Sequence, residues 1–358
     1  MTMQKHLLGS AVALSLGVAL AAAPFSVPAS AQDRPSIAFV APELDITQFF
    51  GQFYSEMTLT LEEAGLEYDR TEAAPPGGQR DIEALDNIMG DMLALQPDYL
   101  VLVISHFDLI EPRLREIQNA GINMVLVEYY DEETDIDPVA WILTDHVESG
   151  YITGYAAGQQ MAERGLEHVE VANFHGTSGS EIGIDRMNGY LEGFHAASIE
   201  HGFTYEVVEE VWTEFNREMA FNVSQDVAIK HPGLDLIFGA NSNTSLGVME
   251  GLRTTGRLGD VAVTGIGGQL EELAGIVRGD ILLAGVRLPR AQGRMAGEII
   301  LTHLEHGDDA EIEKLNFGEQ VVVHDAASVF EFFPIATLDE PEFRRNIPAE
   351  VWDEHAGS

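Results

Sequence analysis

The chain has 358 residues, long enough for two domains of ordinary size, and carries 59 acidic side chains against 19 lysines and arginines, a formal net charge of -40. This charge excludes nucleic-acid binding, which needs a basic footprint. The sequence has no cysteine, which excludes disulfides and a lipid-modified cysteine.

The acidic residues are spread along the whole sequence rather than gathered in one patch, and the lysines are only Lys5, Lys230 and Lys314. Like charges repel at low ionic strength, but at 1 M salt they are screened within about 3 Å. We therefore expect a protein adapted to high external salt. A cationic partner is the alternative, and it would need a concentrated acidic patch.

The first 31 residues have the three parts of a secretory signal peptide. Lys5 precedes the uncharged apolar run from Leu7 to Ala23, and Ala29-Ser30-Ala31 is a cleavage site of small residues. We expect cleavage before Gln32, release into the periplasm as a free monomer, and no direct membrane insertion afterwards. A retained membrane anchor is the alternative.

Apolar strands alternate with helical patterns along the rest of the chain. The first half predicts strands at 36–41, 67–71, 99–104 and 124–127, with helices at 48–64, 82–92 and 112–120. The second half predicts helices at 150–164, 184–201, 217–230, 244–255 and 270–278, with strands at 168–174, 205–211, 234–238, 261–265 and 282–286. Strands that are apolar throughout indicate parallel sheets covered on both faces. The sequence thus predicts an α/β fold of two doubly wound lobes.

Polar and aromatic residues follow the predicted strands, where open α/β sheets bind their ligands. Charged and amide groups there would fix hydroxyls, and aromatic rings would cover the apolar face of a sugar. These strand-end residues are 43–50, 105–106, 128–129, 144–145, 176–179, 241–243, 267–269 and 287.

The motifs of several enzyme classes are incomplete or missing. Gly176-Thr-Ser-Gly179 lacks the end of a P-loop, and Gly265-Ile-Gly-Gly268 does not complete a dinucleotide fingerprint. The sequence has neither a Gly-x-Ser-x-Gly elbow nor a zinc-binding histidine pair. A lone histidine beside acids, His146 near Glu148, is interpreted as a surface residue. We therefore expect a binding protein without a metal or cofactor, and an exported hydrolase is the rival of another class.

Several motifs in order resemble one family, the type I periplasmic binding proteins of sugar ABC importers, similar to ribose- and galactose-binding proteins. The resemblance runs from Ser36 to about Phe343. Its motifs are Thr144-Asp-His-Val-Glu-Ser-Gly150, Gly176-Thr-Ser-Gly179, Arg186-Met-Asn-Gly-Tyr190, Asn241-Ser-Asn-Thr-Ser-Leu-Gly247, Val263-Thr-Gly-Ile-Gly-Gly268 and Arg287-Leu-Pro289.

The resemblance implies a set of ligand-binding residues, to which Ser105 is added as a strand-end hydroxyl. It places aromatic rings at the pocket, a carboxylate and an amide for sugar hydroxyls, an arginine in the second lobe, and a hinge residue that touches ligand. In this order the implied residues are Phe49, Phe50, Phe215, Glu128, Asn241, Arg186 and Thr144. Two positions depart from the family pattern: Gly267 replaces a pocket aspartate and Arg287 replaces a glutamine. Both remain candidate site residues. Such a pocket would favour vicinal hydroxyls, a carboxylate or a borate ester over plain neutral sugars.

The same resemblance implies lobes of residues 36–144 plus 288–323 and 145–287 plus 324–345, with a tail at 346–358. Three hinge segments near Thr144-Asp145, Val286-Arg287 and Val323-His324 would let the lobes close on one small polar, sugar-like ligand. The expected partner is the membrane permease of an ABC importer. The Gly-x-Gly-Gly stretch and Arg287 also look like the quorum-sensing branch, whose receptors bind a furanosyl signal. A sensory receptor acting on a membrane histidine kinase is therefore the alternative.

Overall fold

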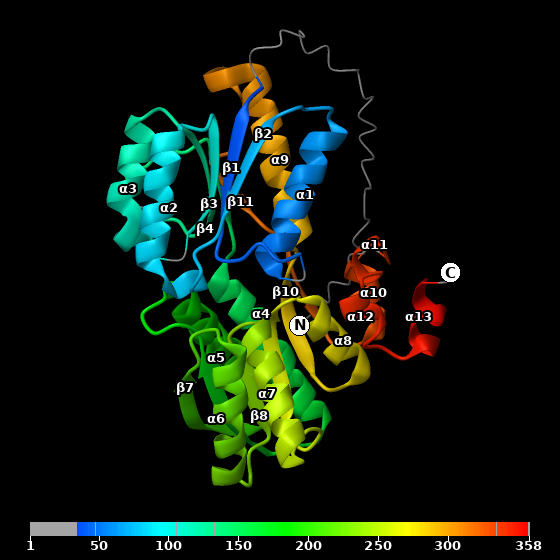
Figure 1. Ribbon diagram of the computed structural model, residues 1–358. Coiled ribbons are helices and arrows are strands. Elements are labelled where there is room, and N and C mark those ends of the chain that lie inside the picture. The colour runs from blue at the N-terminus through cyan, green and yellow to red at the C-terminus, as the bar shows by residue number, and fades with distance from the viewer. Residues whose placement is uncertain (1–33, 47, 105, 132, 334, 357–358) are drawn as a thin grey trace, which may run out of the picture. The chain divides into compact units, whose positions relative to one another are not determined.

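The computed structural model describes residues 34–46, 48–104, 106–131, 133–333 and 335–356. The predicted signal peptide and Ser105 lie outside these described residues. Two mainly parallel sheets, each covered by helices on both faces, make up two lobes (Figure 1). The predicted fold class is thus confirmed.

The first lobe is built on a parallel sheet in the order β11-β5-β4-β3-β1-β2. Its side chains alternate between two apolar layers: Ile37 and Phe39 of β1 face one layer, and Ala38 and Val40 face the other. The strands are β1 Ser36–Val40, β2 Asp69–Ala73, β3 Tyr99–Val103, β4 Asn123–Glu128, β5 Ala140–Leu143 and β11 Leu315–Phe317. The helices are α1 Phe49–Glu63, α2 Ile82–Leu95, α3 Phe107–Asn119 and α9 Pro289–His306, with short η1 Gly78–Arg80 and η2 Gly307–Asp309.

The second lobe repeats this plan in the order β12-β10-β9-β8-β6-β7, with β12 antiparallel to β10. Its strands are β6 His168–His175, β7 Thr204–Trp212, β8 Leu236–Gly239, β9 Ala262–Gly267, β10 Leu283–Arg287 and β12 Gln320–Val323. Its helices are α4 His146–Glu163, α5 Glu181–His201, α6 Arg217–Lys230, α7 Ser242–Thr255, α8 Leu270–Arg278, α10 Ala326–Phe332, α11 Ile335–Leu338, α12 Pro341–Arg344 and α13 Ala349–Ala356. The expected tail contains α13, whose Trp352 packs on the core of this lobe.

Three pairs of helices cover the sheets, and the two helices of each pair approach each other closely at glycines. In α4 and α5, a Cβ on Gly154 would lie 2.0 Å from the Tyr190 carbonyl oxygen, and a Cβ on Gly189 would lie 2.0 Å from that of Val147. The same close approach joins α6 to α7, and it joins α1 to α9, which lie side by side although far apart in the sequence (Figure 1). These glycines allow backbone-to-backbone packing, which holds the N-termini of α4 and α5 together beside the site.

The chain passes between the sheets three times, between Leu143 and His146, at Leu288, and between Phe317 and Gln320. The crossings are hydrogen-bonded to one another: the Leu288 amide donates to the Glu319 carbonyl, and the Gln320 side chain donates to the Asp145 carbonyl. The expected third crossing at Val323-His324, and with it the lobe boundary at 323, is wrong, because β12 pairs with β10 in the second sheet.

The sequence predicted no element after residue 286, where α9, β11, β12 and α10 to α13 lie. The differences before that point are local. Helix α3 begins at Phe107 rather than at Pro112, which lies inside it. Strand β2 lies two residues later than predicted, and β5 with its short apolar run Ala140–Leu143 was not predicted. Within the described residues, no helix is long and apolar enough to cross a membrane.

Candidate ligand-binding site

A cavity of about 230 Å³ lies at the carboxyl ends of both sheets and is lined from both lobes. Eight of the ten predicted site residues line it: Phe49, Phe50, Glu128, Arg186, Phe215, Asn241, Gly267 and Arg287. Thr144 does not. Its buried hydroxyl accepts a hydrogen bond from Gln292 of α9 at 3.2 Å, so it braces the first crossing. The tenth, Ser105, is not described.

A buried ion pair joins the two lobes across this cavity. Arg287, the last residue of β10, donates from Nη1 to Oε1 of Glu128, the last residue of β4, at 2.6 Å. Both residues are at most 5% exposed. The Arg287 guanidinium also lies 3.8 Å from the ring centre of Phe49, a cation–π contact. Its Nε is buried and has no hydrogen-bond partner among the described residues, so it is available to a ligand.

His146, the first residue of α4, connects Glu128 to the other arginine. Its Nε2 lies 3.1 Å from Oε2 of Glu128, and its Nδ1 accepts from Nε of Arg186 at 3.4 Å. Arg186 on α5 also donates to the Ala240 carbonyl at 3.0 Å. The expectation that His146 is a surface residue is wrong: it is 5% exposed. The sequence did not reveal this, because its partners are 18 and 40 residues away.

The charges of this cluster shift one another's pKa values. Burial alone would raise the pKa of Glu128, but Arg287, His146 and Arg186 outweigh it and lower this pKa to about 2. Burial lowers the pKa of His146 to about 4, against the opposing effect of Glu128. At neutral pH the cluster thus holds an ionised carboxylate, a neutral imidazole and two guanidinium groups.

Glu43 is a second acid in the pocket, from the loop after β1. Its Oε1 accepts from the Phe50 amide at 3.3 Å. Burial raises the pKa of Glu43 to about 7, although this amide and Arg287 act in the opposite direction. Glu43 is among the strand-end residues, but the family resemblance did not single it out.

Amide side chains form a second link between the lobes. Gln269, which precedes α8, donates from Nε2 to Oε1 of Gln48 at 2.6 Å and to Oδ1 of Asn243 at 3.3 Å. All three line the pocket. The nearby Asn241 uses its side-chain oxygen to cap α7 at the Thr244 amide, which leaves its amide nitrogen for a ligand.

Aromatic rings cover opposite sides of the pocket. Phe49 and Phe50 of α1 meet edge to face at 5.1 Å, and the Phe215 ring centre lies 5.9 Å from the Arg186 guanidinium. Phe215 and Glu214 have φ of 52° and 55°, and Glu128 has φ of 86°. Three of the four described non-glycine residues with positive φ therefore line the pocket, a costly backbone geometry that collects at functional sites.

Gly267 is a glycine because Ser242 occupies the space beside it. A Cβ there would lie 1.9 Å from the Ser242 hydroxyl. That hydroxyl donates to Glu272 at 2.5 Å, and Ser245 donates to the same buried carboxylate at 2.6 Å. Burial raises the pKa of Glu272. Gly267 stands where the family pattern has a pocket aspartate. A nearby acid here is Glu272, which is buried behind the pocket wall.

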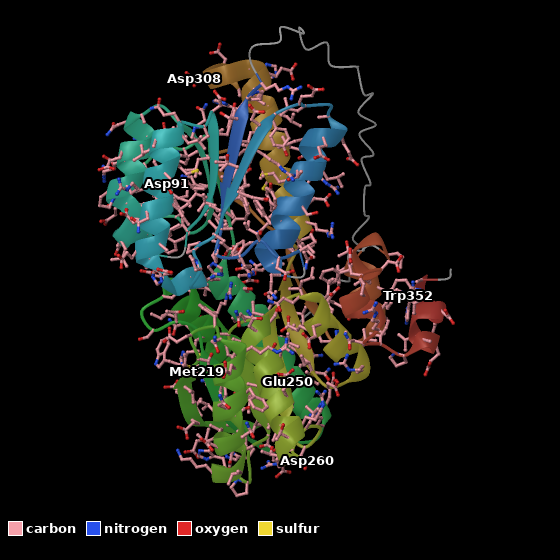
Figure 2. The ribbon with its side chains drawn as sticks, in the orientation of Figure 1. Asp91, Met219, Glu250, Asp260, Asp308 and Trp352 are labelled. Atoms are coloured by element: carbon pink, nitrogen blue, oxygen red, sulfur yellow. The ribbon has the colours of Figure 1, made fainter. Side chains whose placement is uncertain are left out.

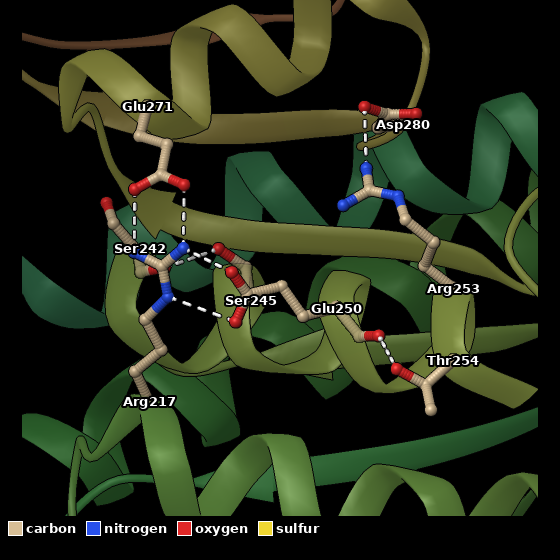
Figure 3. A network of polar contacts seen from close by, with 8 residues as sticks. All are labelled: Arg217, Ser242, Ser245, Glu250, Arg253, Thr254, Glu271 and Asp280. Atoms are coloured by element: carbon tan, nitrogen blue, oxygen red, sulfur yellow. Dashed lines mark hydrogen bonds and ion pairs between the residues drawn. The ribbon is translucent and has the colours of Figure 1, made fainter. Parts of the chain in front are cut away.

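Behind this wall, charged side chains bind three helices of the second lobe together. Arg217 of α6 donates to Glu250 of α7 and to Glu271 of α8, each at 2.6 Å (Figure 3). Within the described residues, no group of three or more His, Cys, Asp or Glu side chains is placed to hold a metal ion.

Comparison with known proteins identifies the family. Residues 37–309 match the model of the periplasmic binding protein domain. The chain belongs to this family. A ribose import binding protein of Salmonella typhimurium is 28% identical over 168 residues, which cover 47% of this chain and 53% of that protein. A D-allose-binding periplasmic protein of Escherichia coli is 29% identical over 146 residues, 38% of this chain and 44% of that protein. The matched segments span about half the length of these relatives.

Solved structures of the family share the whole fold. A periplasmic solute-binding protein of an ABC transporter from Actinobacillus succinogenes, solved with bound D-allose, has a TM-score of 0.71 at 21% identity. The superposition covers 83% of this chain and 100% of the Actinobacillus succinogenes chain. A solute-binding protein from Bacillus halodurans with bound myo-inositol has a TM-score of 0.69 at 17% identity, covering 84% and 97%. The fold is that of the type I periplasmic binding proteins.

Proposed function

We propose that this chain is the periplasmic solute-binding protein of an ABC importer, and that it binds a small, polar, carbohydrate-like ligand between its two lobes. The observation that carries the proposal is the pocket lined from both lobes, with Arg287 and Glu128 joined across it at 2.6 Å. A ligand placed there would touch both sheets at once, as hinge closure requires.

The chemistry of the lining supports a polyhydroxylated ligand. Carboxylates, guanidinium groups and amides hydrogen-bond to hydroxyls, and rings pack on the apolar face of a sugar. We assign the hydroxyl-binding role to Glu128, Arg186, Asn241 and Arg287. The relatives are named for ribose and D-allose, and the solved structures hold D-allose and myo-inositol. These three ligands are all small and rich in hydroxyls.

The proposed place of action is the periplasm, reached through the signal peptide, and the proposed partner is the permease of an importer. Ser242 in the lining is hydrogen-bonded to the Glu272 carboxylate, but Glu272 lies behind the pocket wall and also accepts from Ser245 and the Gly268 amide. We assign this contact a structural role, which favours binding over hydrolysis. A ligand panel including ribose, D-allose and myo-inositol tests the proposal with residues 32–358. At least one of them is expected to raise the melting temperature and to be recovered unchanged. A panel without binding, or a ligand recovered cleaved, would contradict it.

A further inference from the structure

We infer that the ligand of this pocket is a sugar acid, with a single carboxylate that pairs with Arg186. The inference rests on the proposed function and narrows its ligand class from polar carbohydrates to monoanionic ones. It is carried by the arrangement of charges and hydrogen-bond donors around the cavity.

Arg186 is a buried cation without a carboxylate partner. It is 3% exposed and lines the pocket, yet within the described residues no Asp or Glu oxygen lies within 4.0 Å of its nitrogens. Its hydrogen bonds go to two neutral acceptors, the Ala240 carbonyl and the His146 ring. Buried charges in proteins are ordinarily paired, because an unpaired one is costly. A ligand anion would supply the missing partner.

The carboxylates of the pocket leave Arg186 without an ion pair. Glu128 is paired with Arg287, and Glu43 accepts from the Phe50 amide of its own lobe. Glu214 also lines the cavity, but among the described residues none of its oxygens lies within 4.0 Å of a guanidinium nitrogen. Glu272 is held by Ser242, Ser245 and the Gly268 amide and does not line the cavity. Arg186 is thus the one guanidinium of the described lining without a carboxylate against it, and a ligand with one negative charge would supply that partner.

Helix N-termini add to the preference for an anion. The cap and first two residues of α1, Gln48 to Phe50, line the pocket, and so do those of α7, Asn241 to Asn243. The positive end of the helix dipole favours negative groups within the first turn. The unpartnered Nε of Arg287 is a further buried donor at the same cavity.

The rest of the lining is suited to a sugar ring rather than to a small inorganic anion. Phe49, Phe50 and Phe215 offer apolar faces, and the amides of Gln48, Asn241 and Gln269 offer hydroxyl partners. The -40 charge of the chain opposes the approach of an anion only at long range, and molar salt screens that repulsion. The short-range pair with buried Arg186 is screened far less.

The test uses matched pairs of probes at 1 M NaCl: D-glucuronate with D-glucose, D-galacturonate with D-galactose, and D-gluconate with glucitol. Calorimetry is expected to show at least one acid binding tenfold or more tightly than its neutral counterpart. Neutral sugars that bind as well as the acids would overturn the inference but leave the proposed function standing. Binding of a neutral sugar only when boric acid is added would assign the anion to a borate ester and also overturn it. A panel in which neither the acids nor the neutral sugars bind would count against both.

Two variants separate the role of Arg186 from a loss of folding. Arg186→Gln is expected to lose at least tenfold in affinity for the acid, and to lose more for the acid than for the matched neutral sugar, because glutamine keeps a hydrogen-bond donor but removes the charge. Arg186→Lys keeps the charge and is expected to recover part of the preference. The matched control is Arg164→Gln, at the far end of α4, where the side chain is exposed. An Arg186→Gln protein that melts as the native protein does and keeps the full preference for acids would contradict the inference.

Discussion

The contact between Glu128 and Arg287 is the residue-scale feature on which the pocket depends. Removing one partner leaves a buried, uncompensated charge, which typically costs 3–5 kcal/mol. We expect Arg287→Ala to lower the free energy of unfolding by an amount of this order. The double variant Arg287→Ala/Glu128→Gln should lose less than the sum of its single changes, because its remaining group is neutral. Urea denaturation of all four proteins measures this, and strict additivity would show that the two residues do not interact.

Binding should respond to the same change. Charged hydrogen bonds contribute about 1.5–3 kcal/mol, so Arg287→Ala should also weaken the affinity for the best ligand about tenfold or more.

Glu43 gives the molecule a pH dependence with a defined sign. Its folded pKa of about 7 lies above the ordinary 4.5, so the native state binds the extra proton. This contribution to stability is complete below pH 4.5 and is lost as pH rises through 7. Arg287, Glu128 and Asp45 are the charges that face it. We expect the stability difference between the native protein and Glu43→Gln to change by about 3 kcal/mol between pH 4.5 and 8. The exposed Glu192→Gln is the control, and equal pH profiles for Glu43→Gln and the native protein would contradict this expectation.

The sequence predicted the residues that follow strands better than the contacts between them. Arg186 and Arg287 could be placed at strand or helix ends, where an open sheet binds its ligand. His146 could not be assigned, because its neighbours in the chain are acids while its contacts in space are Glu128 and Arg186. The sequence also could not explain why residue 267 is a glycine, because the Ser242 side chain that fills the space beside it belongs to another element, α7.

At the scale of elements, the glycines between α4 and α5 set the position of the site. The Cβ added by Gly154→Ala would lie 2.0 Å from a backbone oxygen, so the helices would have to separate. Overpacking typically costs 1–3 kcal/mol, and we expect at least that loss together with weaker ligand binding. The control is Gly90→Ala in α2, where no atom lies within 4 Å of the new Cβ. That change should be neutral or stabilising by about 0.5–1 kcal/mol. Thermal unfolding measures both, and equal effects would contradict the packing argument.

Most elements up to residue 286 were predicted closely, whereas short β5 and every element after residue 286, the long helix α9 included, were not predicted. Strand β5 has only four residues, and β12 belongs to the second sheet through pairing with β10. Pairing partners are chosen in three dimensions, so no local pattern placed the third crossing between 317 and 320. The Gly-x-x-x-Gly spacing of 150, 154 and 158 was a signal of close helix packing that the sequence did carry.

At the scale of the whole molecule, the charge is spread over both lobes. Asp91 on α2, Asp308 in η2 and Asp260 after α7 are exposed and lie on separate parts of the surface (Figure 2). Salt should therefore stabilise the fold by screening repulsion. We expect the melting temperature to rise between 0.1 and 2 M NaCl, in the ligand-free protein and to a similar extent in Gly90→Ala. A flat or falling melting temperature would remove the argument for adaptation to salt.

We expect one ligand to hold the two lobes together across their shared pocket. Small-angle scattering of residues 32–358, with and without the sugar or sugar acid that binds most tightly in calorimetry, tests it most directly. The account predicts a smaller radius of gyration with ligand and an unchanged far-ultraviolet circular dichroism spectrum, because only the three crossings rotate. A ligand that binds with a calorimetric heat but leaves the radius unchanged would contradict it.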